Sequence, residues 1–461
     1  MVPGTALGVL AGDLVYTWLA LRLMKNTGRT DVTAMPFGID TPTVFAMVFG
    51  VLGPVMVATK DPVLAWKVGM AVTVAIGVAK TLLAFAGDWT RRVVPRAALL
   101  GSIAGVAILL IAYLPMFKIF HEPLTGLIAL LVLFLGLFGG VRMPFGLPAA
   151  FAAVLAGVVA HWGGVWLLDA PHGAIAAGTP RVAVPLPTLA WLDALPATLP
   201  YLTIALPFAL VTIVGGIDNT ESAAAAGDEY RTRDILLTEA LATVLAGACG
   251  GVVQNTPYIG HPAYKSMGCR SGYTLATGLV IGIGAMVGVL SILVTVLPEA
   301  AVACILVYIG LEITAQAFHA SPRHHGAAVA LAFVPVAAAV VLIQASGLLA
   351  GAGKSGADLS GDAAQTWHTL LLLGNGFILT AVVWGSALAA IIDRRFVGAA
   401  VAFAVASVST LFGLMHSPLP SGAVFWAWAP PGPEPLRLAG AYGVLAVLAG
   451  LATLSPRRAA R

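Results

Sequence analysis

The residues of this 461-residue chain that could do chemistry begin with a short acidic stretch, Gly215-Gly-Ile-Asp-Asn-Thr-Glu-Ser222, at the end of an apolar run. Asp218 and Glu221 are three residues apart, so a helix would place both carboxylates on one face. Carboxylates in or beside a membrane span usually face a polar cavity or a proton path. Asp218 is therefore expected to contact a solute or a proton. Glu221 fits that role and the role of a solvated helix end equally well.

Two further segments place prolines, glycines and polar residues inside apolar runs. They are residues 33–45, Thr-Ala-Met-Pro-Phe-Gly-Ile-Asp-Thr-Pro-Thr-Val-Phe, and residues 253–265, Val-Gln-Asn-Thr-Pro-Tyr-Ile-Gly-His-Pro-Ala-Tyr-Lys. Proline removes a backbone donor, so each segment frees backbone groups at membrane depth, where they persist only inside protein or beside a polar cavity. One broken segment in each half is the sequence pattern of a transporter site built from inverted repeats. The alternative is that both segments are loop ends.

These segments supply most of the candidate substrate-binding residues. His261 could hydrogen-bond a solute or share a proton, since the ordinary pKa of histidine is about 6.5, and a structural role is equally open. The candidate substrate contacts are Asp218, Phe37, Gly38, Asp40, Asn255, Thr256, Tyr258, Gly260 and His261, and the candidate proton-coupling residues are Asp218 and Glu221.

The sequence contains no spacing typical of a metal site and no nucleophile–base pair within an apolar span. The three cysteines are scattered and are interpreted as small buried thiols. His319, His324 and His325 fall in one short loop and are interpreted as topology charges rather than ligands. We therefore expect no catalytic residue, no metal and no cofactor, and we expect that the protein is not an enzyme.

Composition indicates the kind of scaffold that must position these residues. Hydrophobic residues make up 59% of the chain and charged residues only 10%, whereas a soluble domain has about a quarter charged residues. Apolar stretches of membrane-spanning length recur along the whole chain, which predicts an all-α polytopic membrane protein. The net charge of +4 does not indicate nucleic acid, because the basic residues lie in short clusters between apolar stretches.

The apolar stretches predict a series of spans separated by short loops. They are residues 6–23, 39–58, 66–86, 97–114, 124–140, 145–160, 201–217, 235–252, 256–267, 273–297, 301–318, 327–344, 369–392, 397–414 and 438–454. With the N-terminus outside, alternation places most loop arginines on the cytoplasmic side, including Arg91, Arg92, Arg394 and Arg395. This pattern predicts a multi-pass protein of the cell (inner or plasma) membrane with a cytoplasmic C-terminus.

At the acidic stretch and the broken segments, the chain resembles the nucleobase–ascorbate transporter family (nucleobase:cation symporter-2), in particular its AzgA-like purine permease branch. Ile217-Asp-Asn-Thr matches the eighth-helix motif of that family, in which an acidic residue faces the purine. Ala34-Met-Pro-Phe-Gly-Ile-Asp resembles its broken third segment, and Asn255-Thr-Pro-Tyr-Ile-Gly its broken tenth segment. The resemblance implies a seven-plus-seven inverted-repeat transporter fold, in which a core domain slides against a gate domain.

Mapped onto this sequence, the resemblance implies a core domain at 1–87 and 198–298 and a gate domain at 88–165 and 299–393. An extracytoplasmic loop falls at 166–197, and an extra C-terminal helix pair at 394–461. Two other departures from the family pattern are expected. The tenth-segment glutamate of many relatives falls at Gly260, and the first helix is missing, which we interpret as an internal start of a longer protein.

The resemblance implies a secondary active permease for a purine or similar nucleobase, working by alternating access and coupled to H⁺ or Na⁺. Phe37 and Tyr258 would stack on the base, and backbone donors near Gly38 and Gly260 would hydrogen-bond its edges. Asp218 would accept hydrogen bonds from the N–H groups of the base, or would accept the coupling proton. The expected partners are the nucleobase, the coupling ion and membrane lipid, with a homodimer left open and no nucleic acid.

Two alternatives stay open at this stage. The first is a sulfate-permease-like anion transporter, in which the N-termini of half-helices would hold an anion. The second is a non-transporting membrane scaffold or sensor with a degraded site, motivated by Gly260 and the absent first helix.

Overall fold

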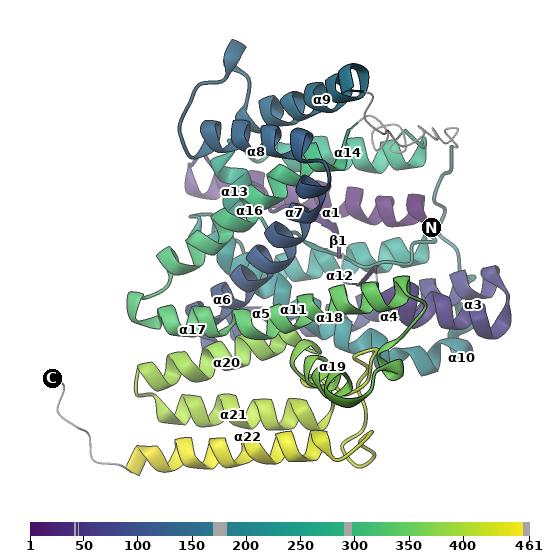
Figure 1. The fold of residues 1–461 in the computed structure, drawn as a ribbon, viewed down its shortest axis with the longest axis vertical. Helices are drawn as coiled ribbons and strands as arrows, with labels where there is room; N and C mark the ends of the chain where they lie inside the picture. The colour runs from purple at the N-terminus through teal and green to yellow at the C-terminus, as the bar shows by residue number, and fades with distance from the viewer. Residues whose placement is uncertain (41–42, 45, 169–181, 290–296, 455–461) are drawn as a thin grey trace.

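The computed structural model describes residues 1–40, 43–44, 46–168, 182–289 and 297–454 (Figure 1). The predicted span 273–297, the predicted loop 166–197 and the C-terminal pair 394–461 therefore each extend in part outside the described residues. Most of the chain is helical, as the sequence predicts, and its helices cross one another in a bundle with β1 and β2 near its centre (Figure 1).

The first half of the bundle contains one of the two broken segments. Its elements are α1 (Val2–Thr27), β1 (Phe37–Ile39), the π-helical η1 (Ala46–Leu52), α3 (Gly53–Thr59) and α4 (Pro62–Ala84). The sequence sets these ends locally. Gly28 closes α1 with a φ of 69°, and the Asp61 carboxylate accepts the first N–H groups of α4.

The second half contains the other broken segment and has a similar order of elements, with one more helix before its strand. Its elements are α11 (Leu202–Ala225), α12 (Thr232–Ala248), β2 (Asn255–Pro257), α13 (His261–Ser266) and α14 (Tyr273–Met286). Helix α4 packs against α12, and α14 packs against α1, so each repeat contributes the same kind of helix pair. The architecture is that of an inverted-repeat transporter fold with broken third and tenth segments, as the sequence predicts.

The remaining helices pack mostly around α6 and α16, apart from α5, η4, α10 and η5, which contact α4, α11 or α12. They are α5 (Gly87–Val93), α6 (Arg96–Val106), η2 (Ala107–Ala112), α7 (Tyr113–His121), α8 (Pro123–Leu137), η3 (Pro144–Gly146), α9 (Ala149–Leu168), η4 (Leu192–Ala194), α10 (Leu195–Thr198), η5 (Leu199–Tyr201), α16 (Glu299–Ala320), η6 (Arg323–His325), α17 (Gly326–Leu331), α18 (Phe333–Gly351), η7 (Gly356–Asp358), α19 (Gly361–Gly374), α20 (Phe377–Ile392), α21 (Phe396–Leu411), α22 (Glu434–Leu451) and η8 (Ala452–Leu454). The extra pair α21 and α22 packs on α20 at the bottom of the view (Figure 1).

Helix lengths and hydropathy fit a membrane environment. Within the described residues, seven helices are long and apolar enough to span a bilayer, and the bent pair α19–α20 adds an eighth. The chain is therefore an integral, multi-pass membrane protein. The largest buried cluster includes Ile119, Leu133, Cys304 and Ile313, where α16 packs on α6, α7 and α8.

One predicted span differs in the structure. The apolar run 369–392 forms two helices, α19 and α20, that are bent by 70° at Asn375 and Gly376. Gly376 adopts a φ of 72°, and a Cβ there would lie 2.1 Å from the Leu414 carbonyl oxygen. Asn375 Nδ2 donates to the carbonyl oxygens of Ser417 and Leu419. The bend depends on this distant loop, so hydropathy does not reveal it.

Candidate functional site

The two broken segments meet at the centre of the fold. β1 and β2 pair antiparallel, with Gly38 opposite Thr256. The pairing extends beyond the strands, because Tyr258 N donates to Pro36 O at 2.6 Å and Asp40 N donates to Gln254 O at 3.1 Å. The groups that the prolines free from helix hydrogen bonding are thus partly satisfied by the other repeat. The two broken segments therefore lie together inside the protein.

We call the place where β1 and β2 pair the crossing. A buried ion pair lies next to it. Lys80 of α4 and Glu239 of α12 are both fully buried and form a short ion pair. Lys80 Nζ also donates to Asn255 O at 2.9 Å and to Gln254 Oε1 at 3.2 Å. An ammonium from one repeat therefore holds the broken strand of the other. Sequence reasoning missed this pair, although a charged residue inside each of two apolar spans was the available signal.

Asp40 acts as a helix cap in this structure. Its Oδ2 atom accepts a hydrogen bond from Thr43 N at 3.0 Å and a shorter one from the Thr43 hydroxyl. Gln254 Nε2 in turn donates to Thr43 Oγ1 at 2.6 Å. The carboxylate predicted to contact substrate thus satisfies the helical turn that follows β1.

The two predicted aromatic contacts lie in different surroundings. Phe37 is buried and packs edge-on against Tyr16 of α1, with ring centroids 5.0 Å apart. A Cβ added at Gly12 would overlap the Phe37 ring, so this glycine makes room for it. Tyr258 is half-buried, and its ring lies 3.5 Å from where a Cβ on Gly38 would stand. The structure therefore brings Tyr258 and Gly38 together and directs Phe37 toward α1.

Asn255 and Thr256 of β2 differ in burial. Asn255 is fully buried, and its Nδ2 atom donates to Ala242 O at 3.2 Å. Its backbone N donates to Thr243 Oγ1 at 3.1 Å. Asn255 is thereby anchored to α12, whereas Thr256 is half-buried beside Gly38. At the crossing, Ile39 is exposed and Gly38, Thr256 and Tyr258 are partly exposed.

His261 belongs to an ionic cluster next to the crossing. Its Nε2 atom lies 3.0 Å from Asp228 Oδ2, and Lys265 Nζ and Arg29 lie 2.8 and 3.1 Å from Asp228 Oδ1. Burial alone would raise the pKa of Asp228. Hydrogen bonds from His261 and Lys265, with one from Thr33 N, outweigh that effect and lower this pKa to about 2. His261 thus has the structural contact that was one of its two open interpretations.

Two neighbouring residues of the acidic stretch on α11, Asp218 and Asn219, contact different parts of the protein. Asp218 is buried, and its Oδ2 atom accepts a short hydrogen bond from Ser102 of α6. The other oxygen, Oδ1, has no hydrogen-bond partner within the described part of the chain. Its neighbour Asn219, which sequence reasoning missed, contacts the crossing instead, donating from Nδ2 to Pro257 O at 2.8 Å.

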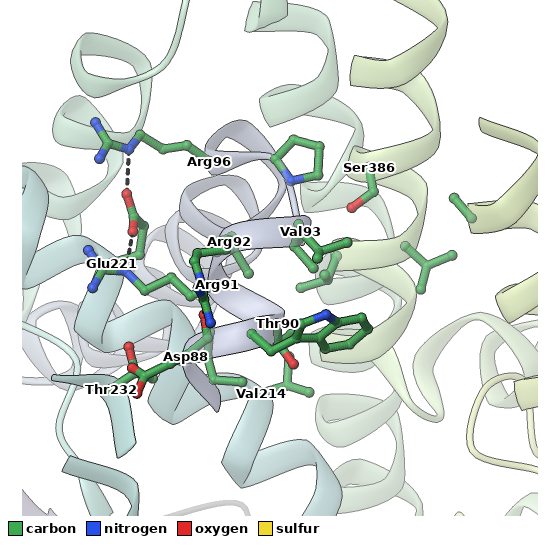
Figure 2. A pocket seen from close by; sticks show the side chains of 18 of the residues that line it. Asp88, Thr90, Arg91, Arg92, Val93, Arg96, Val214, Glu221, Thr232 and Ser386 are labelled. Atoms are coloured by element: carbon green, nitrogen blue, oxygen red, sulfur yellow. Dashed lines mark hydrogen bonds and ion pairs between the residues drawn. The ribbon is translucent and has the colours of Figure 1, made fainter. Parts of the chain in front are cut away.

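Glu221 lies one turn further along α11 and is not solvated. Its carboxylate is buried between Arg91, whose Nε atom is 2.5 Å away, and Arg96, which is closer (Figure 2). This three-residue bridge ties α11 to α5 and α6. It also stands at the edge of a chamber of about 1430 Å³ that opens between these helices and α20 and α21 (Figure 2).

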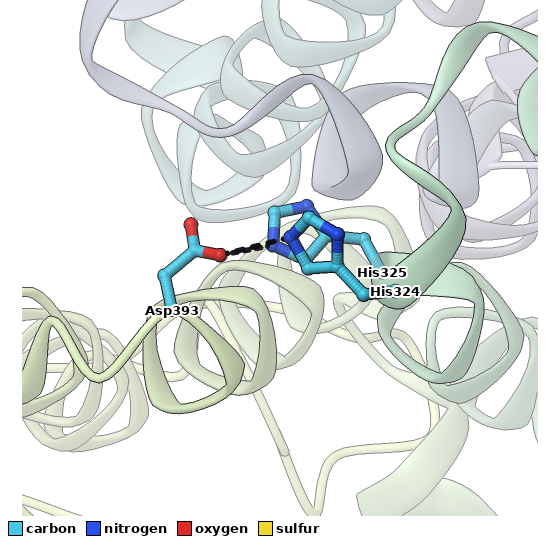
Figure 3. A group of neighbouring side chains, drawn as sticks. All are labelled: His324, His325 and Asp393. Atoms are coloured by element: carbon cyan, nitrogen blue, oxygen red, sulfur yellow. Dashed lines mark hydrogen bonds and ion pairs between the residues drawn. The ribbon is translucent and has the colours of Figure 1, made fainter. Parts of the chain in front are cut away.

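A second group of ligand-type side chains lies at the end of α20. His324 Nε2 and His325 Nε2 lie 3.1 and 2.8 Å from the same oxygen of Asp393 (Figure 3). These three atoms lie within 4.8 Å of one another, close enough to hold a metal ion together. Burial would raise the pKa of Asp393, but the two imidazoles lower it. The histidines interpreted as topology charges thus also pin η6 to α20.

Gly260 occupies a position that few other residues could take. Its φ is 137°, and a Cβ there would lie 3.1 Å from Tyr264 Cε2 and 3.2 Å from Ile309 Cγ2. It is the N-cap residue of α13, which has no side-chain cap. The two repeats therefore differ, because a carboxylate caps the helical turn after β1 and none caps α13.

The paired broken strands and the helices around them fit the inverted-repeat transporter fold that the sequence predicts. No protein-family profile matches the sequence, and no curated protein sequence matches it. Among solved structures, the fold is similar to the transmembrane domain of a cyanobacterial bicarbonate transporter, BicA. The TM-score is 0.44 at 16% identity, over 74% of this chain and 95% of that chain.

The fold is also similar to SLC26A9, with a TM-score of 0.42 at 13% identity, over 73% of this chain and 61% of that one. At such identities the likeness concerns the fold alone. Neither structure is a nucleobase–ascorbate transporter, so the predicted membership of that family was wrong, and with it the nucleobase as substrate. The matching motifs consist largely of Gly, Pro and small polar residues. A broken-helix fold requires such residues for its backbone, so they indicate architecture rather than cargo.

Proposed function

We propose that this protein is a secondary active transporter of a small anion across the cell membrane. The observation that carries the proposal is the antiparallel meeting of β1 and β2, which leaves Gly38, Thr256 and Tyr258 partly exposed at the junction of two inverted repeats. Irregular backbone at membrane depth marks the place where such folds hold their solute.

The backbone at the start of α13, rather than the charges around the crossing, favours an anion over a cation. The buried Lys80 and Glu239 neutralise each other, so they favour neither sign. Asp40 already satisfies the helical turn after β1, whereas α13 begins at Gly260 without a side-chain acceptor. A small anion at the start of α13 would accept hydrogen bonds from the first backbone N–H groups of that helix, as carboxylates do at helix caps.

Transport by alternating access requires contacts that can break and re-form. In this proposal the core is 1–87 with 198–298, and it moves against a gate of 88–165 with 299–393. The contacts of Asp218 with Ser102 and of Glu221 with Arg91 and Arg96 join these two parts. Asp218 would take up the coupling proton, because a buried carboxyl group without a cationic partner is the type of group that forms proton relays in membranes.

The proposal is tested by uptake into liposomes that contain the purified full chain. Radiolabelled bicarbonate, sulfate and succinate are compared with an uncharged solute, and empty liposomes give the background. We expect saturable uptake of at least one anion that the other anions inhibit. Accumulation of the uncharged solute with no anion uptake would show that the proposed cargo is wrong.

The location of the site is tested by filling the crossing. Gly38→Leu places a side chain beside Tyr258 and is expected to abolish anion uptake. Gly347→Leu is the matched control, because nothing lies within 4 Å of a Cβ at Gly347 on α18. Both variants are checked for an unchanged gel-filtration profile. If Gly38→Leu transports like Gly347→Leu, the substrate does not pass the crossing.

A further inference from the structure

The chamber beside Glu221 is lined on three sides by helices. α5 and the start of α6 form one side, α11 and the start of α12 a second, and α20 and α21 the rest (Figure 2). Its volume is about 1430 Å³. Part of this wall is α21, a helix of the extra C-terminal pair, to which the transporter fold assigns no task.

One end of the chamber is rich in arginine. Its lining includes Arg91, Arg92, Arg96, Arg231, Arg233 and Arg395. The carboxylates that line it are fewer, namely Asp88, Glu221, Glu229 and Asp393. Glu221 is already held by Arg91 and Arg96. Over the described ranges, no carboxylate lies within 4.0 Å of the guanidinium groups of Arg92, Arg231 or Arg395, all of which are exposed.

The other end of the chamber is apolar. The lining changes from apolar to charged along the axes of α20 and α21. Along α20 the lining runs from Val382 and Val383 to Asp393, and along α21 it runs back from Arg395 to Val401 and Val405. The 11 helical steps from Val382 to Asp393 span roughly 16 Å. That length is about half of the roughly 30 Å hydrocarbon thickness of a bilayer. The chamber thus has a charged end and an apolar depth matching one lipid leaflet.

From this polarity we infer that the chamber binds one anionic phospholipid. The phosphate lies among Arg92, Arg231 and Arg395, and the acyl chains lie along the valines of α20 and α21. Guanidinium groups bind phosphate oxygens through several donors at once. A free inorganic anion would use only the charged end and would leave the apolar depth filled with water. The inference does not depend on which solute the protein carries.

Such a lipid would contact helices from both predicted domains. α11 and α12 belong to the predicted core, whereas α6 and α20 belong to the predicted gate. A bound lipid would therefore join them on the face predicted to be cytoplasmic. The role of α21 would be to complete the wall against which the acyl chains pack.

Trp89 provides a local probe of occupancy, because it lines the chamber and its side chain is 61% exposed. Phosphatidylglycerol and phosphatidylcholine with brominated acyl chains are titrated into the purified full chain, and tryptophan quenching is recorded. The difference between the wild type and Trp89→Phe isolates the Trp89 signal. We expect saturable quenching by the phosphatidylglycerol and only weak quenching by the phosphatidylcholine.

Two kinds of variant test the two ends of the chamber separately. Arg92→Gln and Arg395→Gln are each expected to weaken phosphatidylglycerol binding about fivefold, as for one basic residue near an anionic lipid. Arg142→Gln is the matched control, since Arg142 is an exposed loop arginine outside the chamber lining. Ala402→Trp fills the apolar wall, keeps every arginine and is expected to weaken binding at least as much.

Three outcomes would overturn the inference. The first is equal quenching by phosphatidylcholine, which would make the chamber an unselective lipid contact. The second is displacement of the brominated phosphatidylglycerol by millimolar glycerol phosphate or inorganic phosphate, which would indicate a site for free anions. The third is unchanged binding in both Arg92→Gln and Arg395→Gln when their gel-filtration profiles match that of Arg142→Gln.

Discussion

Lys80 of the first repeat donates from Nζ to the backbone oxygen of Asn255 in the second repeat, at 2.9 Å and in full burial. Lys80 thereby couples a helix of one repeat to the broken strand of the other. Its charge is balanced by Glu239, also fully buried, on the adjacent helix α12. Lys80 is thus one of several anchors of β2, beside its pairing with β1 and the bond from Asn219 to Pro257 O, and it is a charged one.

Removing the Lys80 ammonium group should lower the stability of the folded protein. Lys80→Met leaves the Glu239 carboxylate buried without its partner, and breaking such a pair from one side costs about 3–5 kcal/mol. We expect a large fall in the thermal unfolding midpoint of the detergent-purified protein. Lys67→Met on the same helix is the control, since Lys67 forms only an exposed pair with Asp193 at 3.4 Å, worth about 0–1 kcal/mol. Equal midpoints for both variants would contradict the role given to Lys80.

Replacing the Asp218 carboxylate should abolish the coupling of transport to protons and leave the folding of the protein unchanged. Asp218→Asn keeps an oxygen that can accept the Ser102 hydrogen bond, so the variant should fold and keep its unfolding midpoint. It cannot bind and release a proton, so stimulation of uptake by a pH gradient should be lost. Uptake with and without the gradient is compared in liposomes. Undiminished stimulation in the variant would show that another group carries the proton.

The backbone at Gly260 should tolerate no side chain. Gly260→Ala forces a non-glycine residue to a φ of 137° and brings its Cβ to 3.1 Å from Tyr264. A cost of about 2 kcal/mol or more is expected from strain and crowding together. Gly268→Ala separates the two causes, since Gly268 has a φ of 90° with nothing within 4 Å of its Cβ position. Chemical unfolding of both variants should show the greater loss for Gly260→Ala.

The stability of the folded protein should fall at acidic pH because of Asp228. Its pKa in the folded protein is about 2, below the ordinary value of about 3.9. A lowered pKa stabilises the folded state above pH 4, and this contribution is lost as the pH falls from about 4 to about 2. Asp228→Asn should be less stable at neutral pH and should lose less stability over that interval. Asp193→Asn, on the surface, serves as the control, and parallel pH curves for the wild type and Asp228→Asn would refute the assignment.

Much of the fold could be predicted because its causes are local in sequence. Membrane-spanning helices follow from runs of apolar residues. The interruptions follow from residues such as Pro36 and Pro257, which remove backbone donors wherever the chain goes next. These properties belong to each segment alone, so the positions of the two breaks could be predicted. The inverted repeats, which the family resemblance implied, were also correctly predicted.

The site itself depended on packing that no segment determines alone. Successive helix residues point about 100° apart, so the sequence could not decide which of Asp218 and Asn219 faces the crossing. The structure turns Asn219 to Pro257 and Asp218 to Ser102. The pairing of Lys80 with Glu239, and the bend at Gly376 beneath the Leu414 carbonyl, likewise join residues far apart in the chain. Apolar pattern and proline decided where the chain breaks, and only tertiary contact decided what each break faces.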